Sequence, residues 1–235
     1  MPIARSVLLA KVANCRTVVL RAARECPSET LDRASAQMGE SLRAIESTRT
    51  LDGLRGVEGD AAHGYFSVFD ELILQQKEAF FFHERSRRPP LDNVNALLSF
   101  LYVLLAHDVA SALEVVGLDP AVGFLHRDRP GRASLALDLM EELRPVLADR
   151  QALTLINRRQ VSPSGFTRSD SGAVTMNEAT RKEVLMAWQS RKQEEILHPF
   201  LNERMPIGLM PYAQALLLAR HLRGDLDAYP SFFWR

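Results

Sequence analysis

The sequence has few cysteines, few aromatic residues and no excess of either charge. Its two cysteines, Cys15 and Cys26, have a spacing that matches no metal-ligand pattern, so we read them as reduced thiols of a cytoplasmic protein. Aromatic residues make up 7% of the 235 residues, and the 29 basic residues are balanced by 29 acidic residues. A net charge of zero excludes a uniformly basic nucleic-acid-binding chain, so any DNA-binding surface has to come from local basic clusters.

Long hydrophobic runs are also missing. The longest apolar tract covers residues 96–106, about half of the ~18 to 20 residues that a membrane-spanning helix needs. The N-terminal segment has Lys11 and Arg16 within its short apolar run, unlike a signal peptide. We therefore expect a cytoplasmic protein with no membrane partner, in which the 96–106 tract forms a buried core helix.

Helical periodicity is present along almost the whole chain. Apolar residues make up 46% of the sequence, which is enough for a sizeable core. We expect an all-α fold of about seven to nine helices, with a flexible loop or short hairpin near 162–176, where the chain is polar and contains glycine. Pro145 is expected to kink a helix over 132–158 or to start a second one. Residues 1–235 are predicted to form one helical catalytic domain, with 84–91 as the only position for a minor subdivision.

The segment over residues 117–142 carries the strongest functional signal. His126 lies in a loop rich in glycine, proline and arginine, and the helix expected after it carries Asp138, Glu141 and Glu142. These acids stand at i, i+3 and i+4, which places them on one helix face. Three carboxylates on one face repel each other unless a positive group offsets them, and a divalent cation does so. The alternative is an ordinary solvated acidic face.

Another acid strengthens the interpretation as a metal site. Glu58 lies among small residues on the expected apolar face of a helix over 51–69, where a carboxylate is costly to bury without a partner. Carboxylates with one imidazole suit Mg²⁺ or Mn²⁺, and basic side chains beside such an ion suit a phosphodiester. Three arginines follow His126 closely: Arg127, Arg129 and Arg132. The pattern predicts a metal-dependent site for phosphate chemistry.

Four blocks of the chain carry a resemblance to a known family. They are EGDAAHGYF at 58–66, RSRRPPLDNVNALLSFLY at 85–102, GLDPAVGFLHRDRPGRASLALDLMEELRP at 117–145 and HPFLNERMPIGLMPYAQALLLARHLRGDLDAYPSFFW at 198–234. In this order they resemble the CRISPR-associated integrase of the spacer-acquisition machinery (the Cas one family), and most nearly its type I-C branch. The resemblance covers essentially the whole chain. It implies a C-terminal helical catalytic domain whose usual N-terminal β-rich domain is absent.

The resemblance also implies the roles of individual residues. Glu58, His126 and Glu141 correspond to the Glu, His and acidic residue that hold a divalent metal in the family, and Asp138 matches an acidic position that supports the site. Asn95 is expected either to satisfy a buried backbone group or to orient a metal ligand by a hydrogen bond, without binding the metal itself. Further residues are expected to contact DNA, although clusters of two or three arginines are also common on ordinary helices: Arg127, Arg129, Arg132, Arg87 and Arg88.

The function that the resemblance implies is metal-dependent phosphoryl transfer. The 3′-hydroxyl of a short DNA fragment would attack a phosphodiester at the edge of a CRISPR repeat. The expected partners are double-stranded DNA and the small adaptation protein of the Cas two family. Relatives form homodimers largely through the β-rich domain, so a homodimer is in doubt for this chain. Two alternatives stay open: a truncated, non-catalytic fragment that binds the partner protein, and a nuclease that uses water as the nucleophile.

Overall fold

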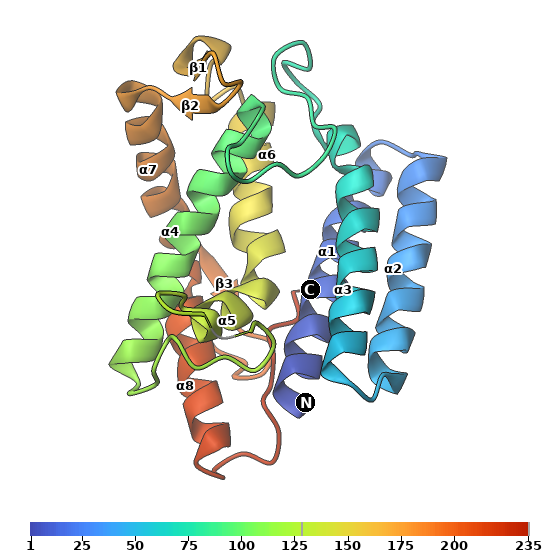
Figure 1. The fold of residues 1–235 in the computed structure, drawn as a ribbon, viewed down its shortest axis with the longest axis vertical. Coiled ribbons are helices and arrows are strands. Elements are labelled where there is room, and N and C mark those ends of the chain that lie inside the picture. The colour runs from blue at the N-terminus through green and yellow to red at the C-terminus, as the bar shows by residue number, and fades with distance from the viewer. Residues whose placement is uncertain (128, 235) are drawn as a thin grey trace.

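The computed structural model describes residues 1–127 and 129–234, which fold into two groups of helices (Figure 1). The first group contains α1 (Pro2–Glu25), α2 (Glu29–Ser47) and α3 (Leu51–Ser67), which lie side by side. Short connections join them, and the hydroxyl groups of Ser28 and Thr50 cap the starts of α2 and α3 by accepting backbone N–H groups. A 3-10 turn, Phe69–Leu72, follows α3.

The second group begins with the long helix α4. Its members are α4 (Asn93–Val115), α5 (Ser134–Arg144), α6 (Arg150–Asn157), α7 (Glu178–Lys192) and α8 (Met210–Leu222). A π turn, Pro145–Asp149, joins α5 directly to α6. The described residues thus form eight α-helices, or seven if α5 to α6 is taken as one, which confirms the expected all-α fold of seven to nine helices.

The π turn shows how the helical chain passes Pro145, which was expected either to kink a helix or to start a second one. Proline has no backbone N–H to donate to the preceding turn and its ring crowds the carbonyl four residues back, so an ordinary α-helix cannot pass through it unchanged. The chain accommodates Pro145 by widening one turn instead of breaking, and it leaves this turn directly into α6. The α5 and α6 segments therefore stay in one helical run.

Two small hairpins complete the fold. β1 (Phe166–Arg168) pairs antiparallel with β2 (Val174–Met176), with Phe166 opposite Met176, which confirms the hairpin expected near 162–176. β3 (Glu195–Leu197) pairs with β4 (Arg204–Pro206), and the sequence did not indicate this second hairpin. Strands of three residues are too short for an alternating pattern to show. Single 3-10 turns precede β1, at Pro163–Gly165, and α8, at Ile207–Leu209.

Helix α4 forms the centre of the second group. Leu97, Leu98, Leu101 and Leu105 are fully buried, and α4 packs against α5 and α8. Among the described residues, α4 is the one helix long and apolar enough to cross a membrane by length and composition, which corrects the expectation that no stretch comes close. In this structure 44% of its most apolar window is buried inside the fold.

The two helix groups meet where α1 packs against α5. Residues 117–127 and 129–133 lie between the end of α4 and the start of α5, beside this contact (Figure 1). The backbone of this loop is fastened to α5 because the N–H groups of Leu135 and Ala136 donate to the carbonyl of Pro120. The α1–α5 contact and this loop bring the sequence-predicted acids and histidine into one region.

We predict that the core of α4 dominates stability. Replacing Leu98, which is fully buried, by alanine should lower the free energy of unfolding by about 2 to 5 kcal/mol, because the deletion leaves a cavity. Val103→Ala on the solvent side of α4, where the side chain is 53% exposed, should change it by less than about 0.5 kcal/mol. Urea denaturation of both variants tests this, and equal losses would contradict the assignment of α4 as a core helix.

Candidate metal and phosphate site

The carboxylate of Asp138 shapes the loop that carries His126. Asp138 is buried on α5 and accepts the backbone N–H groups of Phe124 (2.6 Å), Leu125 (2.8 Å) and His126 (2.9 Å). Its Oδ1 also lies 2.6 Å from Nδ1 of His126. Since a carboxylate can only accept, Nδ1 is the protonated nitrogen of the neutral imidazole, which leaves the lone pair of Nε2 to bind a metal.

The loop approaches α5 so closely that one position requires glycine. A Cβ atom at Gly123 would lie 2.8 Å from Cβ of Ser134 and 3.0 Å from Oδ2 of Asp138. Any larger residue would push the loop away from the carboxylate that holds it. The glycine of the G-F-L-H block is therefore required for the placement of His126.

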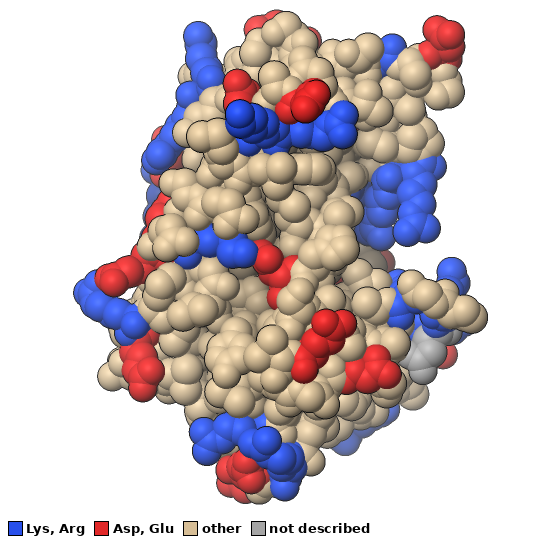
Figure 2. All heavy atoms as spheres, turned by 90° about the vertical axis from the view of Figure 1, so that its left-hand side faces the viewer, with Lys and Arg blue, Asp and Glu red and all other residues tan. Residues whose placement is uncertain are grey.

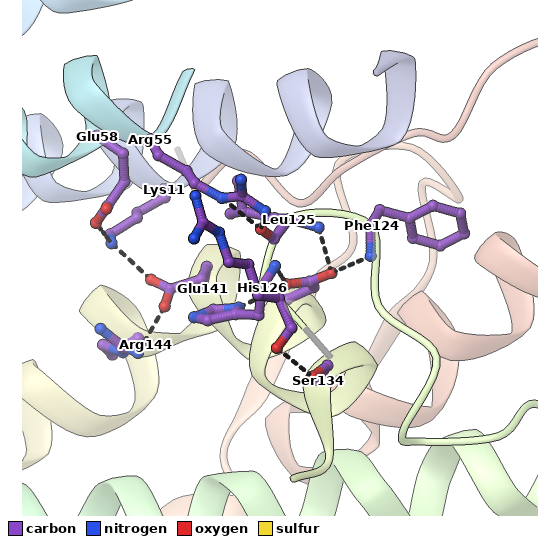
Figure 3. A network of polar contacts seen from close by, with 11 residues as sticks. Lys11, Arg55, Glu58, Phe124, Leu125, His126, Ser134, Glu141 and Arg144 are labelled. Atoms are coloured by element: carbon purple, nitrogen blue, oxygen red, sulfur yellow. Dashed lines mark hydrogen bonds and ion pairs between the residues drawn. The ribbon is translucent and has the colours of Figure 1, made fainter. Parts of the chain in front are cut away.

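Two other predicted ligands meet at the α1–α5 contact, with a lysine between them (Figure 3). The Lys11 ammonium on α1 forms an ion pair with Oε1 of Glu58 on α3 and another, at 2.7 Å, with Oε2 of Glu141 on α5. Arg144, one turn further along α5, donates from Nη2 to Oε1 of Glu141 at 2.7 Å. Lys11 and Glu141 are only 8% and 5% exposed, whereas Glu58 is 28% exposed.

The electrostatics keep these groups charged. Burial would raise the pKa of Glu141, but the nearby Arg144 and Lys11 outweigh it and hold this pKa at about 2. Burial would likewise lower the pKa of Lys11, but the carboxylates of Glu141 and Glu58 raise it above its ordinary value. The arrangement is a buried cluster of two acids and two cations whose charges compensate each other.

Arg55 connects the histidine loop to α3. Its Nε and Nη2 donate to the carbonyl oxygen of Leu125 at 2.9 and 2.6 Å, and its Nη1 donates to Asp52 at 2.7 Å. Arg55 lies one turn before Glu58 on α3, so it fixes the residue just before His126 beside the helix that carries Glu58. This positioning role was not identified from the sequence.

The structure therefore brings three predicted metal ligands to one region. Glu58 comes from α3, His126 from the loop and Glu141 from α5, and the imidazole of His126 lies beside the carboxylate of Glu141 (Figure 3). Within residues 1–127 and 129–234, no group of three or more His, Cys, Asp or Glu side chains is spaced to hold a metal ion as it stands. The Lys11 ammonium forms ion pairs with both carboxylates and so lies in the gap between Glu58 and Glu141.

The donor set nevertheless fits a divalent cation. Oε2 of Glu141 is buried and receives no hydrogen bond of acceptable geometry, although the Lys11 ammonium is 2.7 Å away. His126 presents Nε2, and Glu58 adds a second carboxylate with access to solvent. Two carboxylates and one imidazole are ligands that Mg²⁺ and Mn²⁺ accept. The chemistry of the residues fits the ion once the lysine leaves the gap.

Glu142, the third acid of the α5 face, makes its contacts away from Glu58 and His126. Its carboxylate is fully buried and accepts from the hydroxyl of Tyr229, from Nε2 of Gln214 (2.7 Å) and from the backbone N–H of Phe232 (3.0 Å). Burial raises the pKa of Glu142 to about 7, although these three donors act in the opposite direction. Glu142 fastens the C-terminal segment to α5.

Among the described contacts, Asn95 makes no hydrogen bond to Glu58, His126 or Glu141, which corrects the expectation that it orients a metal ligand. Its Oδ1 accepts from Arg85 Nη1 (2.6 Å) and from the N–H of Ser86 (3.1 Å), and its Nδ2 donates to the carbonyl of Glu84 and to Asp92. Both halves of the amide are used to fold the 84–92 loop back onto the start of α4. The first alternative, satisfaction of buried backbone groups, is the one that the contacts support.

The arginines predicted to contact DNA fall into two patches. Arg127, Arg129 and Arg132 lie in the loop that follows α4, while Arg87 and Arg88 are exposed in the loop that precedes it. The 23 residues of α4 separate the two loops by roughly 33 Å. Figure 2 shows one face of the molecule, on which Lys and Arg form scattered patches with acidic residues between them. The basic surface is thus local, as the neutral net charge requires.

Lys11 and Arg144 are the other residues that sequence reasoning missed. The sequence could have indicated a role for Lys11, because a lysine on the apolar face of a core helix needs an anionic partner. The signal for Arg144 was its position three residues after Glu141, which places both side chains on one helix face. Which acid pairs with Lys11 depended on the packing of α1 against α3 and α5.

The fold and site define a helical protein in which two carboxylates and a partly exposed histidine form a set that suits divalent-metal and phosphate chemistry. The family model described as "CRISPR associated protein Cas1" matches residues 1–190, and the chain belongs to this family. "CRISPR-associated endonuclease Cas1 2" of Rhodospirillum rubrum is 58% identical over 99% of this chain and 70% of its own length. "CRISPR-associated endonuclease Cas1" of Leptospira interrogans is 47% identical, with 100% and 94% of the two chains covered.

Solved structures show the same fold. A Cas1 protein from Thermotoga maritima, TM1797, matches 95% of this chain with a TM-score of 0.79 and 27% identity. A casposase bound to its integration product matches 99% of the chain with a TM-score of 0.86 and 21% identity, which establishes a common fold only. The chain spans 65% and 64% of the lengths of these two structures.

The buried Glu142 predicts a specific pH dependence of stability. A carboxyl group whose pKa is raised on folding stabilises the fold below its unfolded pKa and loses this contribution as pH rises through the folded pKa of about 7. We compare the unfolding free energy of the wild type with that of Glu142→Gln. The difference, wild type minus variant, should therefore decrease by up to about 3 kcal/mol as the pH rises from 5 to 8. Urea denaturation at both pH values measures it, with the exposed Glu46→Gln as the control, and a rising difference would contradict the raised pKa.

Proposed function

We propose that this chain is a metal-dependent DNA integrase and endonuclease of CRISPR adaptation. It joins the 3′-hydroxyl ends of short DNA fragments to a CRISPR repeat by phosphoryl transfer. The observation that carries the proposal is the convergence of Glu58, His126 and Glu141 from three separate elements, in a chain whose Cas1-family relatives are named endonucleases. Residues 1–235 act as one helical catalytic unit.

Mg²⁺ or Mn²⁺ is the cofactor of this proposal, held by Glu58, Nε2 of His126 and Glu141. When bound, such an ion supplies charge stabilisation to a phosphate undergoing substitution. Asp138 keeps Nδ1 of His126 protonated and thereby directs Nε2 towards the ion, and Arg55 keeps the loop beside Glu58. His126 has to be neutral in order to bind, so protonation of its imidazole removes one ligand.

The basic loops bind the DNA backbone. Arginine donates two parallel hydrogen bonds to a phosphate, and Arg127, Arg129 and Arg132 lie on the chain next to His126, so phosphates flanking the reacting one are their natural targets. Arg87 and Arg88 contact the duplex further away, at the other end of α4. Double-stranded DNA is therefore the substrate class.

The remaining partners are proposed from the relatives. A structure named "Cas6-RT-Cas1--Cas2 complex" has a chain that matches 99% of this one with a TM-score of 0.81 and 25% identity, which favours a small Cas2-type adaptation protein as partner. We place the protein in the type I-C branch and in the cytoplasm, where its two free thiols would stay reduced.

The site assignment predicts that two substitutions abolish strand transfer. His126→Ala and Glu141→Ala should each remove a metal ligand and lower integration at least a hundredfold, while circular dichroism still reports a helical fold. The assay uses the full chain, its small partner, Mn²⁺, a labelled DNA fragment with free 3′ ends and a plasmid carrying a CRISPR repeat. Exposed residues provide matched controls, His63→Ala on α3 and Glu46→Ala on α2, and both should integrate normally.

The same assay tells the alternatives apart. Unchanged integration by His126→Ala or Glu141→Ala would refute the site. Released fragments without joined product would identify water as the main nucleophile. Absence of product from the unchanged chain, together with product from a version fused to the extra length of the Rhodospirillum rubrum relative, would identify a fragment that binds partners without catalysing.

We predict that DNA affinity depends strongly on salt concentration and that each arginine bound to a phosphate contributes to this dependence. Each phosphate contact releases about one counterion, so the logarithm of the binding constant falls linearly with the logarithm of salt concentration. Arg129→Ala should reduce the slope by about 1, whereas Arg43→Ala on the exposed side of α2 should leave it unchanged. Fluorescence anisotropy between 50 and 200 mM salt measures the slope, and equal slopes for all three proteins would remove Arg129 from the DNA surface.

A further inference from the structure

Lys11 is the one lysine or arginine that the described contacts place against two of the proposed metal ligands at once. Its ammonium forms ion pairs with Oε1 of Glu58 and with Oε2 of Glu141. The side chain is 8% exposed and projects from the middle of α1, between the two helix groups. An ammonium ion in this position offsets the repulsion between two carboxylates that lie on different helices.

The same two oxygens are needed by a divalent cation. A metal held by Glu58 and Glu141 has to bind carboxylate oxygens that the Lys11 ammonium now contacts, and two cations at such short range repel each other strongly in a buried site. Arg144 does not compete in this way, because it contacts the other oxygen of Glu141, Oε1. Oε2 of Glu141 is buried and lies 2.7 Å from the Lys11 ammonium, so an ion that displaces the ammonium has to take over the compensation of this charge.

We propose that Lys11 is an internal competitor for the metal, which occupies the Glu58–Glu141 gap when no ion is bound and sets how tightly the ion binds. This inference rests on the proposed function, because it assumes that Glu58, His126 and Glu141 are the ligands. Binding of the ion moves the ammonium out of the gap, which breaks two ion pairs. The free energy needed to break them is subtracted from the intrinsic affinity of the site, so the lysine stabilises the metal-free protein and weakens metal binding.

The test measures Mn²⁺ affinity directly by isothermal titration calorimetry or by the electron paramagnetic resonance signal of free Mn²⁺. Lys11→Met removes the charge and keeps a side chain of similar length, so the metal-free protein should lose thermal stability and bind Mn²⁺ at least tenfold more tightly. Saturating Mn²⁺ should then raise the melting temperature of this variant more than that of the wild type. Lys11→Arg keeps a cation in the gap and should not tighten binding.

A matched control separates competition from a general charge effect. Lys77 is an exposed lysine paired with Asp70, so Lys77→Met changes the net charge by the same amount outside the site. This variant should bind Mn²⁺ like the wild type. Tightening by Lys77→Met equal to that by Lys11→Met would overturn the inference, and so would unchanged or weaker binding by Lys11→Met.

A second variant covers the case in which Lys11→Met does not fold without metal. Lys11→Gln is neutral but can still donate a hydrogen bond to a carboxylate, and it should also bind Mn²⁺ more tightly than the wild type. Recovery of the folded state of Lys11→Met on addition of Mn²⁺ would support the inference. If neither neutral variant binds Mn²⁺ more tightly than the wild type, the inference is wrong.

His126→Ala distinguishes failure of this inference from failure of the proposed function. If the wild type and His126→Ala bind Mn²⁺ equally, His126 is not a ligand and the proposed site is wrong. If binding by the wild type depends on His126 but is insensitive to Lys11, only the competition by lysine is wrong. Calorimetry reports both results without any measurement of strand transfer.

Discussion

The buried carboxylate of Glu141 is the feature on which the rest of the site depends. A carboxylate with 5% exposure is costly to bury without partners, and Lys11 and Arg144 compensate its charge from two different helices. Lys11 also holds Glu58 and thereby couples α1, α3 and α5 at the contact between the two helix groups. Compensation of one buried charge thus fixes the relative position of three elements.

Three acids within five residues of α5 perform three different tasks. Asp138 accepts backbone N–H groups and shapes the loop that presents His126, Glu141 faces the two cations, and Glu142 accepts from Tyr229 and from the backbone of Phe232 in the C-terminal segment. Each partner lies on a different part of the chain. A helix of eleven residues therefore organises the loop, the site and the C-terminal segment.

The neutral net charge is compatible with a DNA-acting protein because electrostatic attraction is short-ranged at physiological salt. Exposed charges further apart than about 8 Å are largely screened from each other. The basic patches at the two ends of α4 therefore act independently, and acidic residues elsewhere on the surface do not cancel them. What matters for a phosphate near His126 is the local set of arginines in its own loop.

The sequence by itself determined the helical fold, a loop or short hairpin near 162–176 and the placement of Asp138 and Glu141 on one helix face, because periodicity and spacing are local properties. That Glu58 and His126 belong with these acids came from the resemblance of four sequence blocks to a known family. Only the tertiary structure decided which groups these acids contact. It placed Lys11 between Glu58 and Glu141, turned Glu142 towards Tyr229 and used Asn95 to fold a neighbouring loop. These contacts join residues far apart in the chain, and no spacing along the sequence encodes which helix packs against which.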